Sequence, residues 1–223
     1  MIKLDRLTKS FPMRGGGRKV VIDELTTVFP SGKSVALLGR NGAGKSTLLR
    51  LISGALRPTS GRILSTGTIS YPVGFAGSFH PQLTGAQNTR FVARIYGVDT
   101  DELVDYVQEF AELGRHFHMP FRTYSAGMRS RLSFGVSMGV PFDTYLVDEV
   151  MSVGDGAFRE KSVAVFAERR RSAGAIVVTH SPPMVRALCD IAVVLENGSV
   201  VPYTDIEAAL EHHEENMRGP RPD

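Results

Sequence analysis

The sequence has little cysteine and no long apolar run. Cys189 is the only cysteine among 223 residues, which rules out an internal disulfide and fits a reducing compartment. Residues 2–11, directly after Met1, read IKLDRLTKSF and lack the apolar stretch of a signal peptide. No segment approaches the roughly 18 continuous apolar residues that cross a bilayer. We therefore expect a chain that reaches a membrane only through a partner.

A strong charge of one sign is also missing. The formal net charge is +3, and the charged residues are scattered without a long Lys/Arg block. The nearest approach to such a block, Arg169–Arg171, follows Glu168 within a predicted helix, and a solvated helix face explains it better than a binding surface. We therefore expect no nucleic-acid partner.

Residues 39–47 read GRNGAGKST and fit the pattern G-x-x-x-x-G-K-[ST] of a P-loop. Its glycines let backbone N–H groups approach a phosphate, Lys45 supplies positive charge, and Ser46 offers a hydroxyl to Mg²⁺. A buried strand is predicted before the loop and a helix after it, so a phosphate would lie at a helix N-terminus. A chance match of a glycine-rich turn is a poor alternative in this context. We expect a nucleoside triphosphate site formed by Gly39, Asn41, Gly42, Gly44, Lys45, Ser46 and Thr47.

The order of predicted elements indicates an α/β fold with an insertion. Residues 2–11 and 19–29 are typical of two strands, residues 84–140 show helical spacing, and from residue 144 strands and helices alternate. This alternation predicts a mostly parallel sheet with helices on both faces and right-handed crossovers. The other predicted elements are strands 34–38, 67–71, 144–148, 175–179 and 191–196, a turn at 58–61, and helices 84–97, 101–113, 126–138, 156–171 and 205–215.

Two carboxylates end one of the predicted strands. Residues 145–149 read YLVDE, and nucleotides in open α/β sheets lie beside such strand ends. Asp148 would hold Mg²⁺, and Glu149 would act as general base toward the attacking water. The alternative is a pair of surface acids at the end of a strand, which the upstream P-loop disfavours.

An imidazole follows another predicted core strand. Residues 177–181 read VVTHS, which places His180 at the end of that strand. A lone histidine is more often a hydrogen-bonded structural residue. Its position nevertheless favours a contact of His180 with the γ-phosphate and the attacking water.

A second phosphate-binding device is predicted in residues 123–132, which read TYSAGMRSRL. Ser125 and Gly127 offer a hydroxyl and bare backbone amides at the start of a helix. One chain seldom needs two such devices for one γ-phosphate. We therefore expect the second device to serve a nucleotide held by another subunit.

With these motifs, nearly the whole chain resembles the nucleotide-binding subunit of an ABC transporter. YSAGM stands at the place of the LSGGQ-type signature, GRNGAGKST at the Walker A motif and YLVDE at the Walker B motif. Residues 152–155 take the place of the D-loop, and Thr179-His180 that of the H-loop. The resemblance implies that Asp155 belongs to the site and that Phe11 stacks on adenine. From the residues alone, Phe11 is equally consistent with a strand core.

The resemblance also implies a fold and a domain organisation. The expected fold is a RecA-like P-loop NTPase, with a mostly parallel core, an inserted α-helical subdomain and an N-terminal antiparallel β region. The chain is expected to be one nucleotide-binding domain over residues 1–223. Its core would comprise approximately residues 1–84 and 142–217, and its helical subdomain approximately residues 85–141.

One segment departs from the family pattern. The family usually carries a glutamine where the core meets the helical subdomain, whereas Gln82 comes late, directly before L-T-G. Coordination of magnesium by a glutamine is therefore in doubt. The segment is still expected to form the groove that receives the permease.

Longer stretches resemble one branch of the family. Residues 70–88, 123–138 and 147–155 resemble the ATPases that export bacterial capsular polysaccharide. Teichoic-acid and O-antigen exporters share the HP-x-LTG and S-x-GM-x-x-RL patterns. The resemblance implies ATP and Mg²⁺ as ligands, with Lys45, Glu149 and His180 as catalytic residues. It further implies a homodimer bound to integral-membrane permease subunits at the cytoplasmic face of the inner membrane.

Two other classes of protein remain as alternatives. A permease-free ABC-type ATPase that acts on nucleic acid or ribosomes often has two cassettes or long coiled-coil insertions, which this sequence lacks. A P-loop kinase or GTPase would leave the signature segment unexplained, and a guanine-reading N-K-x-D is absent.

Overall fold

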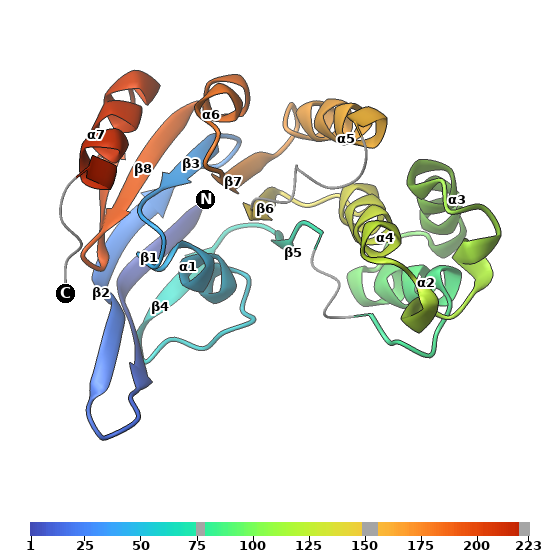
Figure 1. Ribbon diagram of the computed structural model, residues 1–223, viewed down its shortest axis with the longest axis horizontal. Helices are drawn as coiled ribbons and strands as arrows, with labels where there is room; N and C mark the ends of the chain where they lie inside the picture. The colour runs from blue at the N-terminus through green and yellow to red at the C-terminus, as the bar shows by residue number, and fades with distance from the viewer. Residues whose placement is uncertain (75–78, 149–155, 219–223) are drawn as a thin grey trace. The chain divides into compact units, whose positions relative to one another are not determined.

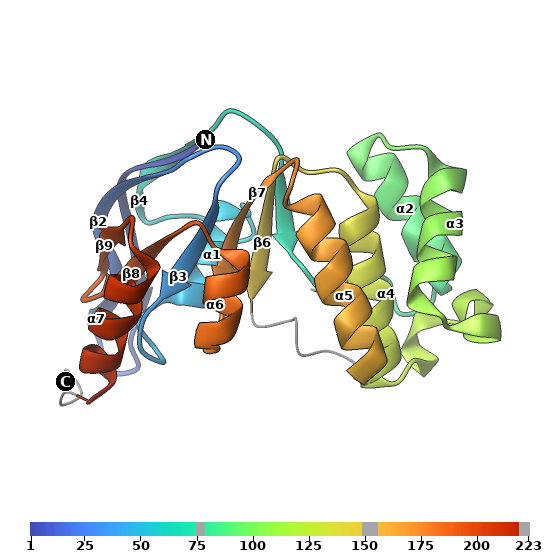
Figure 2. The same ribbon diagram turned by 90° about the horizontal axis from the view of Figure 1, so that it is seen from above.

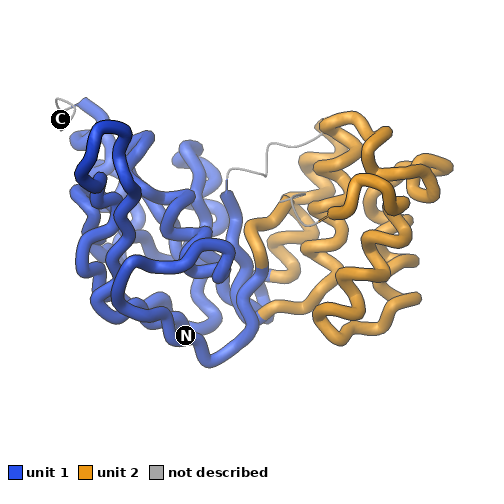
Figure 3. The backbone as a smooth tube through the Cα atoms, turned by 90° about the horizontal axis from the view of Figure 1, so that it is seen from below, with its two compact units in different colours: residues 1–70, 143–149, 170–223 blue, residues 71–142, 150–169 orange. Residues whose placement is uncertain are grey.

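The computed structural model describes residues 1–74, 79–148 and 156–218. The chain forms two compact units, which Figure 3 colours separately. The first unit comprises residues 1–70, 143–149 and 170–223, and the second comprises residues 71–142 and 150–169. The second unit thus includes the block 85–141 that was expected to be helical. The expected subdomain boundaries themselves stay a prediction.

The first unit begins with a small antiparallel sheet. Strand β1 (Ile2–Pro12) pairs with β2 (Arg18–Phe29) on one side and with β4 (Ser60–Ser65) on the other. Ile2 lies opposite Phe29 and Ser65 in the two registers, and it is buried together with Leu4 and Leu7 on one face of β1. The predicted N-terminal antiparallel β region is therefore confirmed.

The larger sheet has the order β5-β6-β7-β3-β8-β9 among the described strands, of which Figure 1 labels all but β9. Pairs β3–β7, β3–β8 and β6–β7 are parallel, whereas β8–β9 is antiparallel. Every residue of β3 and β7 is buried, as expected for central parallel strands covered on both faces. These strands are β3 (Ser34–Leu38), β5 (Ile69–Pro72), β6 (Thr144–Asp148), β7 (Gly174–Val178), β8 (Ile191–Glu196) and β9 (Ser199–Tyr203).

Helices α1 (Lys45–Ile52), α6 (Pro182–Leu188) and α7 (Ile206–Arg218) complete the first unit. Leu48 and Leu49 of α1 are fully buried in a core shared with β1, β3 and β8. Helix α7 packs along β8 and also contacts β3, β9 and α6 (Figure 2). The core therefore holds α1 and α7 in fixed positions about the sheet.

The second unit is built from helices α2 (Gly85–Tyr96), α3 (Thr100–Ala111), α4 (Ala126–Gly139) and α5 (Gly156–Arg169). Thr84 and Gln87 form a capping box at the start of α2, which explains why the helix begins there. Between α3 and α4 lie the short 3₁₀ helices Gly114–His118 and Phe121–Thr123. The Phe110 ring contacts the Tyr106, Phe134 and Phe158 rings and so joins α3 to α4 and α5.

None of the helices in the described ranges is long and apolar enough to cross a membrane.

Candidate nucleotide-binding site

The P-loop joins β3 to α1 within the first unit (Figure 1). Gly44 caps α1 in the left-handed region at φ 107°, and the helix has neither a side-chain cap nor an acidic residue in its first turn. A Cβ on Gly44 would lie 2.8 Å from Val21 Cγ1. A Cβ on Gly39 would lie 2.5 Å from the carbonyl oxygen of Leu195, at the end of β8. The loop therefore packs against its neighbours at these glycines, and within the described residues no side chain caps the start of α1, where the helix dipole favours an anion.

Lys45 is buried, and its ammonium lies over the loop. Its Nζ donates to the carbonyl oxygen of Gly39 at 2.6 Å and to that of Arg40 at 3.1 Å. These carbonyls hold the charge at the place where the loop would surround a phosphate. Because an ammonium has three donors and both acceptors are neutral, a phosphate would compete well for it.

Ser46 and Asp148 fit a Mg²⁺ site by their chemistry. Ser46 is exposed in the first turn of α1, and Asp148 is half-buried at the carboxyl end of β6, against which α1 packs. Hydroxyl and carboxylate oxygens are the ligands that Mg²⁺ takes, together with phosphate oxygens and water. Both predicted ligands thus lie in the first unit with suitable donors.

His180 follows β7 and is exposed, as expected for a residue at the end of a core strand. A second histidine, His213 of α7, lies close enough to be affected by it. Burial lowers the pKa of His213, and electrostatic interactions with Lys45 and His180 lower it further. Its buried Nδ1 has no hydrogen-bond partner among the described residues. The sequence gives no sign of His213, because this residue lies in an amphipathic surface helix and belongs to no motif.

Phe11 is near the end of β1 with 38% of its surface exposed, so it is not part of the strand core. The Lys9 ammonium lies 5.1 Å from the centroid of its ring. An exposed ring of this kind can stack on a base. The geometry is compatible with the adenine contact, which stays a prediction.

The signature residues lie in the second unit. Ser125 is the N-cap of α4, and its Oγ accepts a hydrogen bond from the Met128 backbone N–H at 3.2 Å. Gly127 is exposed in the first turn, and a Cβ there would meet only Ser125 Oγ, at 4.0 Å. The preceding residue, Tyr124, is buried, and its hydroxyl donates to the carbonyl of His116 at 2.6 Å. Ser125 and Gly127 are thus exposed at the N-terminus of α4, at the surface of this unit.

Parts of three predicted features lie outside the described residues, namely Glu149, Asp155 and residues 75–78 of the segment before Gln82. Gln82 itself is exposed, and its backbone N–H donates to His80 Nδ1 at 3.3 Å.

A family model described as ABC transporter matches residues 22–152, which include the P-loop, the signature segment and the Walker B strand. The chain belongs to the ABC transporter family. Within this family it is an ATP-binding subunit and an ATPase, so the predicted family and enzyme class are confirmed.

Two ABC relatives from bacteria are similar over almost their full length. The polysialic acid transport ATP-binding protein of Escherichia coli is 51% identical, with 91% of each chain covered. The capsule polysaccharide export ATP-binding protein of Neisseria meningitidis serogroup B is 43% identical, with 96% of this chain and 98% of the relative covered.

A solved ABC structure shows the same fold at lower identity. A dimeric ATP-binding cassette in a post-hydrolysis state, bound to ADP and phosphate, superposes with a TM-score of 0.77 at 20% identity. The match covers 92% of this chain and 99% of that one. The predicted P-loop NTPase fold is therefore confirmed, and the roles of single residues stay predictions.

Proposed function

We propose that this chain is the ATP-hydrolysing subunit of an ABC exporter that moves a polysaccharide, and specifically a lipid-linked capsular polysaccharide, out across the bacterial inner membrane. The observation that carries the proposal is the 43–51% identity, over nearly full length, to two ATP-binding proteins named for the transport of polysialic acid and of capsule polysaccharide. A teichoic-acid or O-antigen exporter is the alternative within the same branch of the family.

The residues of the P-loop would hold the triphosphate. Lys45 would turn from the loop carbonyls to the β- and γ-phosphates, while the backbone N–H groups at the start of α1 bind phosphate oxygens. Phe11 would stack on the adenine. Bound Mg²⁺, held by Ser46 and Asp148, would offset the phosphate charge. The remaining loop contacts are assigned to Gly39, Asn41, Gly42, Gly44 and Thr47.

Hydrolysis would use two further side chains at the ends of core strands. Glu149 would accept a proton from the attacking water, and His180 would position that water for in-line attack on the γ-phosphate. Asp155 is assigned to the D-loop beside them. The exposed position of His180 at the end of β7 is consistent with its role.

A second copy of the chain would complete each site. Two copies would pack head to tail and enclose two ATP molecules, with Ser125 and Gly127 of one copy facing the P-loop of the other. The open N-terminus of α4, with the Ser125 hydroxyl at its cap, supports a phosphate contact from this side. Because ATP would bind the closed dimer better than the open one, binding and hydrolysis can alternate the two states.

The work would be done on integral-membrane permease subunits. We assign the docking surface to residues 75–84, of which 75–78 lie outside the described part, and to the neighbouring helix α2. Phe91 and Ile95 are one turn apart on α2 and are 50% and 59% exposed, which suits burial against a partner. The chain would then act at the cytoplasmic face of the inner membrane.

Purification from the native host tests this proposal. A tagged chain should recover an integral-membrane subunit from detergent-solubilised membranes, and deletion of its gene should leave polysaccharide inside the cell. The gene carrying Lys45→Ala serves as the control, since its product should still recover the membrane subunit without restoring export. Recovery of the chain alone, together with normal surface polysaccharide in the deletion strain, would favour a permease-free ATPase instead.

A further inference from the structure

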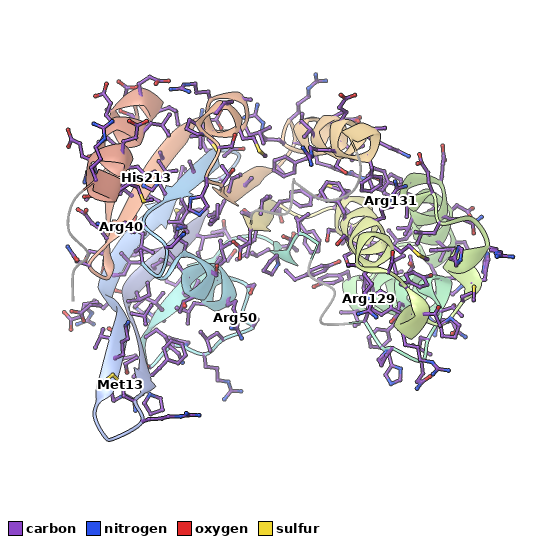
Figure 4. The ribbon with its side chains drawn as sticks, in the orientation of Figure 1. Met13, Arg40, Arg50, Arg129, Arg131 and His213 are labelled. Atoms are coloured by element: carbon purple, nitrogen blue, oxygen red, sulfur yellow. The ribbon has the colours of Figure 1, made fainter. Side chains whose placement is uncertain are left out.

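The P-loop is tied to the C-terminal helix by one side chain. Arg40 Nη1 donates a hydrogen bond to the backbone carbonyl oxygen of Asn216 at 2.7 Å. Asn216 lies in the last turn of α7, where carbonyl groups have no partner within the helix and the helix dipole is negative. A guanidinium is therefore well placed there, because it pairs with an acceptor that the helix itself does not satisfy and interacts favourably with the negative end of the dipole. Figure 4 labels Arg40 and His213 beside α7 in the first unit.

The acceptor is itself held in place. The Asn216 side-chain Nδ2 donates to Glu196 Oε2 at 2.6 Å, and it lies 3.1 Å from His212 Nε2. His212 in turn contacts Tyr203 of β9, with 2.9 Å between Nδ1 and the phenol oxygen. The last turns of α7 are thus joined to β8 and β9, and the Asn216 carbonyl has a defined position.

The backbone of Arg40 also forms hydrogen bonds within the P-loop. Its backbone carbonyl accepts hydrogen bonds from Lys45 Nζ and from the Ala43 N–H, both at 3.1 Å. The preceding Gly39 passes so close to Leu195 that no Cβ would fit. The first half of the P-loop is therefore held between the end of β8, through Gly39, and the end of α7, through the Arg40 side chain.

From these contacts we infer that Arg40 is a positioning residue for ATP binding, which sets the conformation of the P-loop by capping α7. The inference rests on the proposed role of this loop in holding ATP. A loop that is already fixed loses less conformational freedom when its ligand binds. Arg40 should therefore affect the affinity for ATP rather than the rate of the chemical step, in which it takes no part.

Steady-state ATPase kinetics of the full chain test this inference from the loop side. Arg40→Ala should raise the KM for ATP about tenfold, as expected for one hydrogen bond to a charged group, while kcat changes less than about twofold. Arg40→Lys keeps the charge and one donor, and should recover part of the affinity. Arg50→Ala is the matched control, because it removes an exposed arginine from α1 and should leave KM and kcat unchanged.

The same link can be broken from the helix side without changing the loop. Met217→Pro disfavours the helical conformation of the residue before it and so turns the Asn216 carbonyl away from Arg40. It should raise the KM as Arg40→Ala does, and the double variant should show no further increase. Met217→Ala, at the same exposed position, keeps the helix and should behave as the unchanged chain.

Hydrogen exchange supplies a readout that needs no nucleotide. In Arg40→Ala, the amides of residues 213–218 should exchange faster than in the unchanged chain and in Arg50→Ala.

Two kinetic outcomes would overturn the inference. One is an unchanged KM in both Arg40→Ala and Met217→Pro. The other is a raised KM in Arg40→Ala alone, because Arg40 would then act directly on the nucleotide. If the unchanged chain does not hydrolyse ATP, the proposed function fails, while hydrogen exchange still decides whether Arg40 holds α7. If Arg40→Ala does not fold, the two Met217 variants carry the same test.

Discussion

The ring of His213 lies on α7 in surroundings that disfavour its charged form. Burial is the main reason that its pKa is lowered, and Lys45, His180 and His212 lower it further, whereas Glu214 raises it. The native state therefore binds a proton at His213 less readily than the unfolded chain does. The stability associated with the neutral ring is complete above the unfolded pKa of 6.5 and is lost as the pH falls through 6.5 toward the lowered native value.

His213→Gln should reduce the pH dependence of folding. The unchanged chain should lose more stability between about pH 8 and pH 5 than the variant does, because only the former has to protonate this ring. Urea unfolding at both pH values measures the difference. His118→Gln, which replaces an exposed histidine in the second unit, should follow the unchanged chain. Parallel stability curves for His213→Gln and the unchanged chain would contradict the assignment.

The sequence could predict the P-loop residues but not the bond that anchors them. GRNGAGKST has a fixed spacing, because a phosphate requires glycines and a lysine at set positions. The bond from Arg40 to Asn216 instead joins residues 176 positions apart and ends on a backbone carbonyl. Every residue has such an acceptor, so the local pattern around Asn216 could not indicate it.

At the scale of secondary structure, most predicted helices and strands are found within a few residues of their expected bounds. Helix α4, expected at 126–138, spans Ala126–Gly139. Strand β4 was not predicted, because its side chains are mostly exposed and show no alternation. Strand β9 was also not predicted, although Asn197 and Gly198, with φ of 47° and 78°, form a two-residue hairpin connection that the sequence could have indicated.

A substitution at Gly44 tests the junction between the P-loop and α1. Gly44→Ala should destabilise the chain by about 1–2 kcal/mol through its left-handed backbone alone, and by more because the new Cβ meets Val21 Cγ1 at 2.8 Å. ATP binding should weaken as the start of α1 shifts. Urea unfolding and equilibrium ATP binding measure both effects.

Removal of the neighbouring methyl groups separates these two causes. In Gly44→Ala combined with Val21→Ala, the steric part should disappear and the backbone part should remain, so the two effects should not add. Strict additivity of the two single variants would show that the contact with Val21 contributes nothing.

At the scale of the whole molecule, the motifs are divided between the two units. The P-loop and Asp148 belong to the first unit, and the signature residues Ser125 and Gly127 belong to the second. The proposed arrangement brings the P-loop of one copy to the signature of another, so assembly and ATP binding should depend on each other. This reciprocity is required of any two linked binding events.

Glu149→Gln should retain ATP binding, lose turnover and accumulate as a dimer. The glutamine cannot accept the proton of the attacking water, so the closed state would persist with ATP bound. Size-exclusion chromatography with light scattering, at saturating ATP, measures the dimer, and phosphate release measures turnover. Lys45→Ala, which loses the phosphate contact, should stay monomeric under the same conditions. Unchanged hydrolysis by Glu149→Gln would show that another group is the base.

The N-cap of α4 limits which residues can stand at the signature position. One lone pair of the Ser125 hydroxyl already serves the helix, through the Met128 N–H at 3.2 Å, and the hydroxyl proton remains for a ligand. Asparagine or aspartate would cap the helix as well as serine does. An ionised aspartate, however, has no proton to donate and would repel an anion. If Ser125 contacts a phosphate as proposed, residue 125 has to meet two separate demands, and helix capping is met by more residue types than phosphate binding.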